Sequence, residues 1–194
     1  MSINESLRTA LKKRTIIADG AMGTMIQAAD PSLEDFEGLE GCNEILNVSR
    51  PDIIKEVHRK YLSVGCDAIE TNTFGANFAN LAEYGIPDRI YELAYAGGKI
   101  AKEVTEEFSE KKWVLGSIGP GTKLPTLGHI EFEQLRQTYF QCAKGLVDAG
   151  VDGLLIETAQ DLLQAKAAVI AAREAIDKSE RDVVLIVQIG RAHV

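Results

Sequence analysis

The chain has 194 residues, of which 45% are hydrophobic, and its 21 basic and 29 acidic residues give a net charge of -8. This length and composition allow a buried core, as one domain or part of one, and argue against disorder. The negative charge, without any run of Lys or Arg, argues against a nucleic-acid partner because a phosphate backbone would be repelled. No apolar stretch approaches the roughly 20 residues of a membrane span, and residues 1–14 are too polar for a secretory signal, so we expect a cytoplasmic protein with no membrane partner.

The cysteines Cys42, Cys66 and Cys142 are odd in number and widely scattered, which is typical of reduced thiols rather than of a disulfide framework. No CxxC or HxxxH spacing occurs among them and the histidines, so we expect no metal site built from these residues. Cys66 and Cys142 lie in apolar surroundings that favour burial. Cys42 lies in a glycine-rich loop, where a thiol can be exposed, and we assign it no role.

Short apolar runs alternate with longer amphipathic segments along the chain. The apolar runs are typical of strands buried on both faces, and the amphipathic segments of helices. Pro51 begins one helix after the capping residue Ser49, and glycines end two of them, at Gly65 and Gly150. The expected strands are 15–19, 68–72, 113–117, 153–157 and 183–189, and the expected helices are 51–64, 87–108, 132–149 and 161–176.

One motif occurs twice, as GCDAIET at 65–71 and as GVDGLLIET at 150–158, each time after a helix. In both copies a glycine ends the helix, an aspartate follows, and a short apolar strand runs into a Glu-Thr pair. A carboxylate at the carboxyl end of a strand is how parallel α/β folds present functional groups. Solvation of a strand end would explain one such pair, but two at equivalent positions favour a functional role for Glu70 and Glu157.

The alternation of strands and helices predicts an α/β fold with a parallel sheet covered by helices. A doubly wound sheet and a (β/α)8 TIM barrel are both open, and polar residues after the first four strands favour the barrel. A complete barrel needs about 250 residues and eight strands, whereas this chain has five, and residues 190–194 begin no helix. We therefore expect residues 1–194 to be the N-terminal part of a barrel domain, its first five βα units, truncated before strand six.

The first expected strand leads directly into the segment DGAMGT at 19–24. Its glycines permit positive φ and close backbone approach, so the amides of residues 20–23 can hold a carboxylate while Asp19 takes a cation. The third glycine of the dinucleotide-binding fingerprint is absent. An Asp-Gly pair is also simply a good turn, and this motif alone favours neither reading.

Polar side chains also follow the later strands. The segment ETNTFGAN at 70–77 is a dense polar cluster beside a buried strand, which requires protein partners or a ligand. The segment GSIGPGT at 116–122 is another glycine-rich loop that a substrate can approach. We expect Asp19, Glu70 and Glu157 to converge at the barrel mouth. Carboxylates for an ammonium group and bare amides for a carboxylate suit a zwitterionic ligand.

Taken in order, these motifs resemble the N-terminal homocysteine-binding module of the cobalamin-dependent methionine synthase family. The resemblance implies a (β/α)8 barrel that binds homocysteine as its zinc thiolate, for methyl transfer from methylcobalamin carried on another module. In that family, acidic residues matching Asp19 and Glu157 hold the ammonium, and backbone amides matching residues 20–23 hold the carboxylate. The resemblance rests on residues 19–27, 41–47, 49–51, 70–74, 118–120 and 156–158. The implied substrate-binding residues are Asp19, Gly20, Ala21, Met22, Gly23, Asn72, Phe74 and Glu157.

The chain departs from the family in its cysteines. The family's three zinc-binding cysteines follow strands six and eight, so we expect them beyond Val194, and none of the cysteines present matches them. Without them the homocysteine thiol is not activated at neutral pH, and we name no catalytic or metal-binding residue. The expected partners are homocysteine and the cobalamin- and folate-binding modules of a parent protein. Two alternatives stay open: a betaine-type or other cobalamin-independent homocysteine methyltransferase, and a catalytically inactive fragment.

Overall fold

A computed structural model of the chain describes residues 5–189. Its strands form one parallel sheet in the order β1-β2-β3-β4. A parallel sheet in sequential order, with a helix in every connection, is the wall of a β/α barrel. The strands are β1 (Ala68–Glu70), β2 (Trp113–Ile118), β3 (Gly153–Ile156) and β4 (Val184–Val187).

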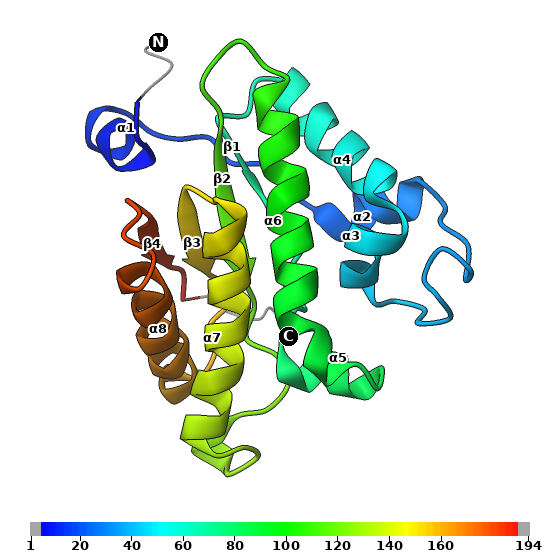
Figure 1. Cartoon of the computed structure of the whole chain (residues 1–194), viewed down its shortest axis with the longest axis vertical. Coiled ribbons are helices and arrows are strands. Elements are labelled where there is room, and N and C mark those ends of the chain that lie inside the picture. Colours follow the sequence, from blue (N-terminus) through cyan, green and yellow to red (C-terminus); the bar gives the residue numbers. More distant parts are fainter. Residues whose placement is uncertain (1–4, 190–194) are drawn as a thin grey trace.

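Helices cover one face of this sheet. In Figure 1, α4 (Pro51–Ser63), α6 (Ile90–Glu106), α7 (Phe132–Ala149) and α8 (Leu162–Asp177) follow one another in chain order, and α7 contacts both α6 and α8. Two glycines allow α6 and α7 to approach closely, because an added Cβ would lie 2.6 Å from Ala149 at Gly98 and 2.7 Å from the Tyr91 carbonyl oxygen at Gly145. No helix among the described residues is long and apolar enough to cross a bilayer.

The opposite face of the sheet carries a smaller core. Side chains alternate between the two faces along a strand, so every second residue of β1, β2 and β3 points away from the helix layer. α1 (Leu7–Lys13) covers the amino-terminal end of this face. The same alternation brings Glu70 and Ser117 to this face at the carboxyl ends of the strands. The buried members of this core are Leu7, Ala10, Ala68, Trp113, Leu115 and Leu155.

The structure confirms four of the five expected strands, with small shifts at their ends. The expectation of a full strand at 15–19 is wrong, because this segment makes only a single bridge, between Ala18 and Ala68. The amide of Ile17 bonds the Asp67 side chain at 2.9 Å instead of a strand carbonyl, and residues 19–21 form no regular structure before a helix begins at Met22. The segment nevertheless runs parallel to β1, with the Asp19 amide 3.1 Å from the Ala68 carbonyl oxygen.

The four expected helices are also confirmed, with 87–108 divided into η2 (Pro87–Arg89) and α6. Gly65 (φ 104°) and Gly150 (φ 100°) follow α4 and α7 in the left-handed conformation that ends helices. Shorter helices were missed, because so few residues carry little periodic pattern. The missed helices are α1, α2 (Met22–Ala28), η1 (Asn43–Ile45), α3 (Leu46–Ser49), α5 (Phe78–Glu83) and η3 (Pro125–Leu127). The expectation that no helix begins at 190–194 lies outside the described residues.

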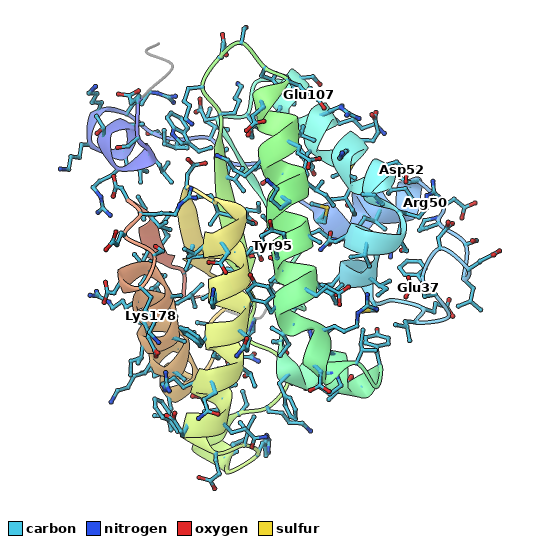
Figure 2. The ribbon with its side chains drawn as sticks, in the orientation of Figure 1. Glu37, Arg50, Asp52, Tyr95, Glu107 and Lys178 are labelled. Atoms are coloured by element: carbon cyan, nitrogen blue, oxygen red, sulfur yellow. The ribbon has the colours of Figure 1, made fainter. Side chains whose placement is uncertain are left out.

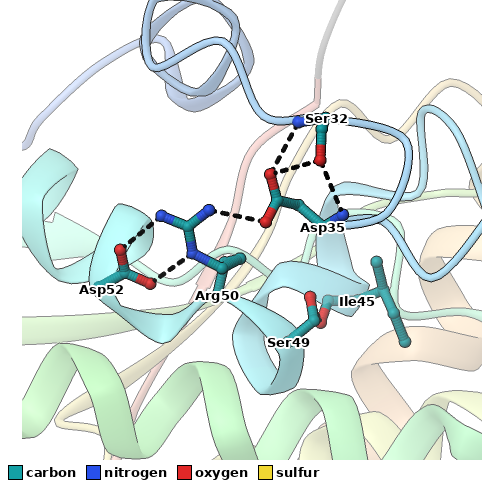
Figure 3. A network of polar contacts seen from close by, with 6 residues as sticks. All are labelled: Ser32, Asp35, Ile45, Ser49, Arg50 and Asp52. Atoms are coloured by element: carbon teal, nitrogen blue, oxygen red, sulfur yellow. Dashed lines mark hydrogen bonds and ion pairs between the residues drawn. The ribbon is translucent and has the colours of Figure 1, made fainter.

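Arg50 ties the long loop after α2 to the start of α4 (Figure 3). Its guanidinium donates to both Asp52 oxygens at 2.9 and 2.7 Å and to Asp35 at 2.7 Å. Asp35 also accepts hydrogen bonds from the amide and hydroxyl of Ser32, at 2.7 and 2.9 Å. Figure 2 shows Arg50 and Asp52 side by side on the outer surface near α4. These contacts hold the loop that leads into η1, which forms one wall of the cavity described below.

The aspartates of the repeated motif align neighbouring segments of the sheet. Asp67 accepts from the Ile17 amide at 2.9 Å and from the guanidinium of Arg14 at 2.7 and 2.8 Å. Asp152 accepts from the Val114 amide at 2.9 Å and from a lysine of α6 at 3.0 Å. In each copy the carboxylate bonds the backbone of the preceding extended segment. The repeat therefore fixes the register at the amino-terminal ends of the strands.

The outermost strand, β4, leads us to expect self-association of the purified chain. Val187 is 43% exposed, and the rest of β4 is only partly buried. An apolar edge strand without charge or proline is typical of aggregation sites. We expect the purified chain to bind a dye that reports exposed apolar surface and to self-associate, while its far-UV circular dichroism keeps the helical signal. Val187→Lys should reduce both the dye binding and the self-association. Val64→Lys, at an exposed position after α4, is the matched control. A monodisperse preparation of the unsubstituted chain with a sharp cooperative melt would contradict the prediction.

Candidate functional site

A cavity of about 390 Å³ opens at the carboxyl ends of β1, β2 and β3. The start of α2 and η1 form one side of it, and the strand ends form the other. This is the edge of the sheet at which the sequence analysis placed a ligand. The lining residues are Gly20, Ala21, Met22, Gly23, Asn43, Glu44, Glu70, Thr71, Asn72, Phe74, Ser117 and Glu157.

Two carboxylates reach this cavity from the sheet. Glu70 ends β1, Glu157 follows β3, and Ser117 of the intervening strand β2 lies between them. The Ser117 hydroxyl donates to Glu157 Oε1 at 2.5 Å, and the Glu157 amide donates to the Ile118 carbonyl at 3.2 Å. Both the backbone and the side chain of Glu157 are therefore held by β2.

Asp19 lies behind the lining of the cavity rather than on it. Its Oδ1 accepts a hydrogen bond from the Glu70 amide at 2.9 Å. Its Oδ2 is buried and finds no hydrogen-bond partner within residues 5–189. A buried carboxylate oxygen without a hydrogen-bond donor is costly to the fold. The structure thus brings Asp19, Glu70 and Glu157 together, as the sequence predicted.

Burial and mutual repulsion raise the pKa values of two of these carboxyl groups. Burial raises the pKa of Asp19 to about 7, with a further contribution from the charge of Glu157. Burial also raises the pKa of Glu70 to about 7, and Glu157 and Asp19 add to the effect. Because both values lie above the ordinary range, ionisation disfavours the folded chain as the pH rises from about 4 through about 7. A cation bound among these groups would favour their charged forms.

The turn at 20–23 leaves its backbone accessible, though not through the positive φ that its glycines permit. Neither Gly20 nor Gly23 has a positive φ, and the nearest atoms to an added Cβ lie 3.5 Å and 3.9 Å away. Ala21 precedes α2, whose first turn begins at Met22 without a side-chain cap. The amides at a helix start have no partner within their own helix. The turn therefore offers uncapped amide groups next to the cavity.

Asn72 lines the cavity, but its side chain is engaged by the protein. Its Nδ2 donates to the Asn43 carbonyl at 2.8 Å and to Asn47 Oδ1 at 3.0 Å. Asn47 Nδ2 in turn donates to the Asn72 carbonyl at 2.8 Å. These bonds clamp η1 and α3 against the end of β1. Asn72 therefore shapes the cavity by holding its wall in place.

The threonines of the polar cluster likewise find partners inside the protein. Thr71 Oγ1 accepts from the Ser117 amide at 3.0 Å and lies 2.6 Å from Thr73 Oγ1. Thr73 Oγ1 donates to the Ser117 carbonyl at 2.7 Å. The cluster is therefore partly a connection between β1 and β2. Its members that remain turned to the cavity include Glu70 and Phe74, and Phe74 is 43% exposed.

Asn43 and Glu44 line the η1 side of the cavity and were not among the predicted site residues. Glu44 is only 8% exposed, and burial raises its pKa. Its signal in the sequence is a glutamate directly before the apolar pair Ile45 and Leu46. A buried acid requires a partner, but a single glutamate before two apolar residues does not reveal which distant group that partner is.

The described cysteines do not fit a zinc site. All three are buried, and burial raises the pKa of Cys42 to about 11 and that of Cys142 to about 12. Zinc requires thiolates, which a raised pKa disfavours. Within residues 5–189 no group of three or more His, Cys, Asp or Glu is arranged to hold a metal ion. The expectation that the Cys42 thiol can be exposed in its loop is wrong, because η1 and its surroundings bury this residue completely.

A parallel β/α wall with an acid-lined cavity at the carboxyl ends of its strands defines a ligand-binding domain of the β/α-barrel class. Comparison with known sequences is more specific, because residues 16–191 match the family described as homocysteine S-methyltransferase. The chain belongs to the homocysteine S-methyltransferase family.

Similar proteins of known name agree with this assignment. The chain is 52% identical over 180 residues to a methionine synthase of Mycobacterium tuberculosis (strain ATCC 25618 / H37Rv) and 49% identical over 186 residues to that of Mycobacterium leprae (strain TN). These matches cover 91% and 94% of the chain but 15% of each relative. The crystal structure of the metallated homocysteine methyltransferase MmuM from Escherichia coli superposes with a TM-score of 0.70 at 23% identity, covering 92% of this chain and 64% of that one. This likeness confirms the barrel fold class.

The raised pKa values give a direct test of the acidic site. In a ¹³C NMR titration of the carboxyl carbons, we expect Asp19 and Glu70 to titrate near pH 7. Asp35 and Glu133 serve as internal controls, because hydrogen bonds from arginines lower both of their pKa values to about 2. Asp19→Asn should lower the pKa of Glu70 by removing one repelling charge. If both Asp19 and Glu70 titrate with the usual pKa of an aspartate and a glutamate, then this part of the cavity is hydrated and the carboxyl groups do not interact.

Proposed function

We propose that the chain is the homocysteine-binding part of a methionine synthase, in which a methyl group passes to the thiol of homocysteine and gives methionine. The observation that carries the proposal is the convergence of Asp19, Glu70 and Glu157 beside the uncapped turn at 20–23. The methionine synthase relatives support it, and because the chain spans 15% of their length, the complete reaction is proposed for a larger protein.

The carboxylates account for the amino group of the substrate. Glu157 presents its carboxylate on the cavity wall, and Asp19 supplies an unpartnered Oδ2 from behind it. An ammonium group carries three N–H donors and the opposite charge, so it can satisfy both residues with charge-assisted hydrogen bonds. Binding would also stabilise the ionised form of Asp19, whose pKa is raised to about 7 in the free chain. We therefore assign Asp19 and Glu157 to the ammonium.

The remaining lining residues suit the other parts of an amino acid. The backbone amides of residues 20–23, at the uncapped start of α2, are assigned to the substrate carboxylate, since backbone N–H groups there lack partners. Phe74 offers an apolar ring on the cavity wall for the methylene groups. Asn72 holds the cavity wall in place through its bonds to Asn43 of η1 and Asn47 of α3.

Activation of the thiol is assigned to zinc, which when bound lowers the pKa of a thiol ligand. The cysteines at 42, 66 and 142 do not fit as its ligands, so no step of the transfer is assigned to the described residues. We further propose methylcobalamin on another module as the methyl donor, with cobalamin- and folate-binding modules as partners of the chain. The motifs at 19–24 and 70–74, which resemble the cobalamin-dependent branch, support this choice over a betaine-type enzyme.

Removal of either ammonium ligand should weaken substrate binding. We expect Asp19→Ala or Glu157→Ala in the full-length parent to reduce homocysteine affinity by about 1.5 to 3 kcal/mol, the usual scale for a charge-assisted hydrogen bond. Isothermal titration calorimetry measures the change. Glu133→Ala removes an exposed acid on α7 and is the matched control. Unchanged affinity in both site variants would defeat the assignment.

The purified chain alone should show no methyltransferase activity with any donor. The reason is the missing set of metal ligands, not the binding cavity, which is expected to remain able to take up homocysteine. Methionine formation and metal content, measured on the same preparation, test this separation. Turnover accompanied by one zinc per chain would show that the metal site has been misplaced.

A further inference from the structure

Glu44 forms an unusual contact on the wall of the cavity opposite the ammonium ligands. It belongs to η1, is 8% exposed, and accepts a hydrogen bond at Oε1 from the amide of Gly75 at 2.6 Å. The partner residue directly follows Phe74, the exposed aromatic residue of the cavity lining. A buried carboxyl group therefore holds the turn that carries this ring.

The fit between Glu44 and Gly75 is close. A Cβ added at Gly75 would lie 2.7 Å from Glu44 Oε1 and 2.9 Å from Cδ and Oε2, which is closer than such contacts allow. Gly75 has no positive φ, so its backbone conformation does not require glycine. A side chain at position 75 would therefore displace the Glu44 carboxyl group from its present place.

The other side of the same turn is held by the backbone after β2. The Gly119 amide donates to the Phe74 carbonyl at 3.2 Å. A Cβ at Gly119 would lie 2.4 Å from that carbonyl oxygen and 2.9 Å from two atoms of the Phe74 ring. The ring thus lies close to the Gly119 backbone on one side, while Glu44 holds the next residue on the other.

We propose that Glu44 is a positioning residue that sets the place of the Phe74 ring and thereby determines which amino-acid side chain the cavity accepts. The hydrogen bond to Gly75, rather than the charge of Glu44, performs this role. For its ligand the inference rests on the function proposed above, but the position of the ring can be tested without any ligand.

Phe74→Trp provides the reporter for the ring. The natural Trp113 is fully buried, so quenching of the added tryptophan by acrylamide reports on position 74. In this background we expect Glu44→Ala to raise the quenching constant at least about twofold, because the turn loses the hydrogen bond that holds the Gly75 amide. Glu44→Gln should leave quenching as in the reporter protein, since its amide oxygen can accept from Gly75.

The same substitutions with Phe74 retained separate positioning from charge. We expect Glu44→Ala to weaken L-homocysteine binding about tenfold, and Glu44→Gln to weaken it less than about twofold. Glu40→Ala, at an exposed glutamate before the same helix, is the matched control for both measurements. Gly75→Ala should reproduce Glu44→Ala, and the double variant should add little, because both remove one contact.

The outcomes are distinct. Unchanged quenching and affinity in Glu44→Ala would overturn the proposal, as would a loss in Glu44→Gln equal to that in Glu44→Ala. If Glu44→Ala does not fold, Gly75→Ala decides, and unchanged quenching there overturns the proposal. If the protein without these substitutions binds no homocysteine, the proposed function fails. The quenching results still decide the role of Glu44.

Discussion

The hydrogen bond from the Glu70 amide to the Asp19 carboxylate joins the segment 15–19 to β1, and the acidic corner of the cavity follows from it. Backbone pairing along this segment is limited to a single bridge, so a side-chain contact supplies the link that a longer strand would provide. The contact removes the carboxylate from water and leaves one of its oxygens unpaired. The connection that completes this edge of the sheet therefore also creates a site with an unmet demand for positive charge.

On the opposite wall of the cavity, the polar side chains are paired by hydrogen bonds, whereas the carboxyl groups of the acidic wall repel one another. Asn47 and Asn72 exchange hydrogen bonds with each other and with nearby carbonyl groups, and Glu44 bonds the Gly75 amide. Each such bond adds little net stability, but loss of one partner leaves a buried polar group unpaired. This wall therefore has one arrangement that satisfies its groups, and the exposed ring of Phe74 is presented by a rigid support.

These two walls differed in how well the sequence predicted them. The long helices and the last four strands could be predicted because hydrophobic periodicity and the closing glycines Gly65 and Gly150 agree locally. Glu70 and Glu157 could be predicted because their motif repeats. Glu44 could not, since it lies in a short 3-10 helix and its partner is 31 residues away in the chain. The shortened strand at 15–19 escaped prediction for a similar reason, because the side chain of Asp67 replaces a backbone partner.

The repeated Gly-x-Asp motif bears on how a sheet of this kind can be inherited. Asp67 and Asp152 each align their own strand with the segment before it, so each occurrence of the motif carries the group that sets the alignment of its strand. The motif precedes β1 and β3 but not the intervening strand, so the repeating block is a pair of strand–helix units. Exchange of such a block between related barrels would preserve strand alignment without compensating changes elsewhere. An insertion between the aspartate and its strand would shift every side chain of that strand to the opposite face.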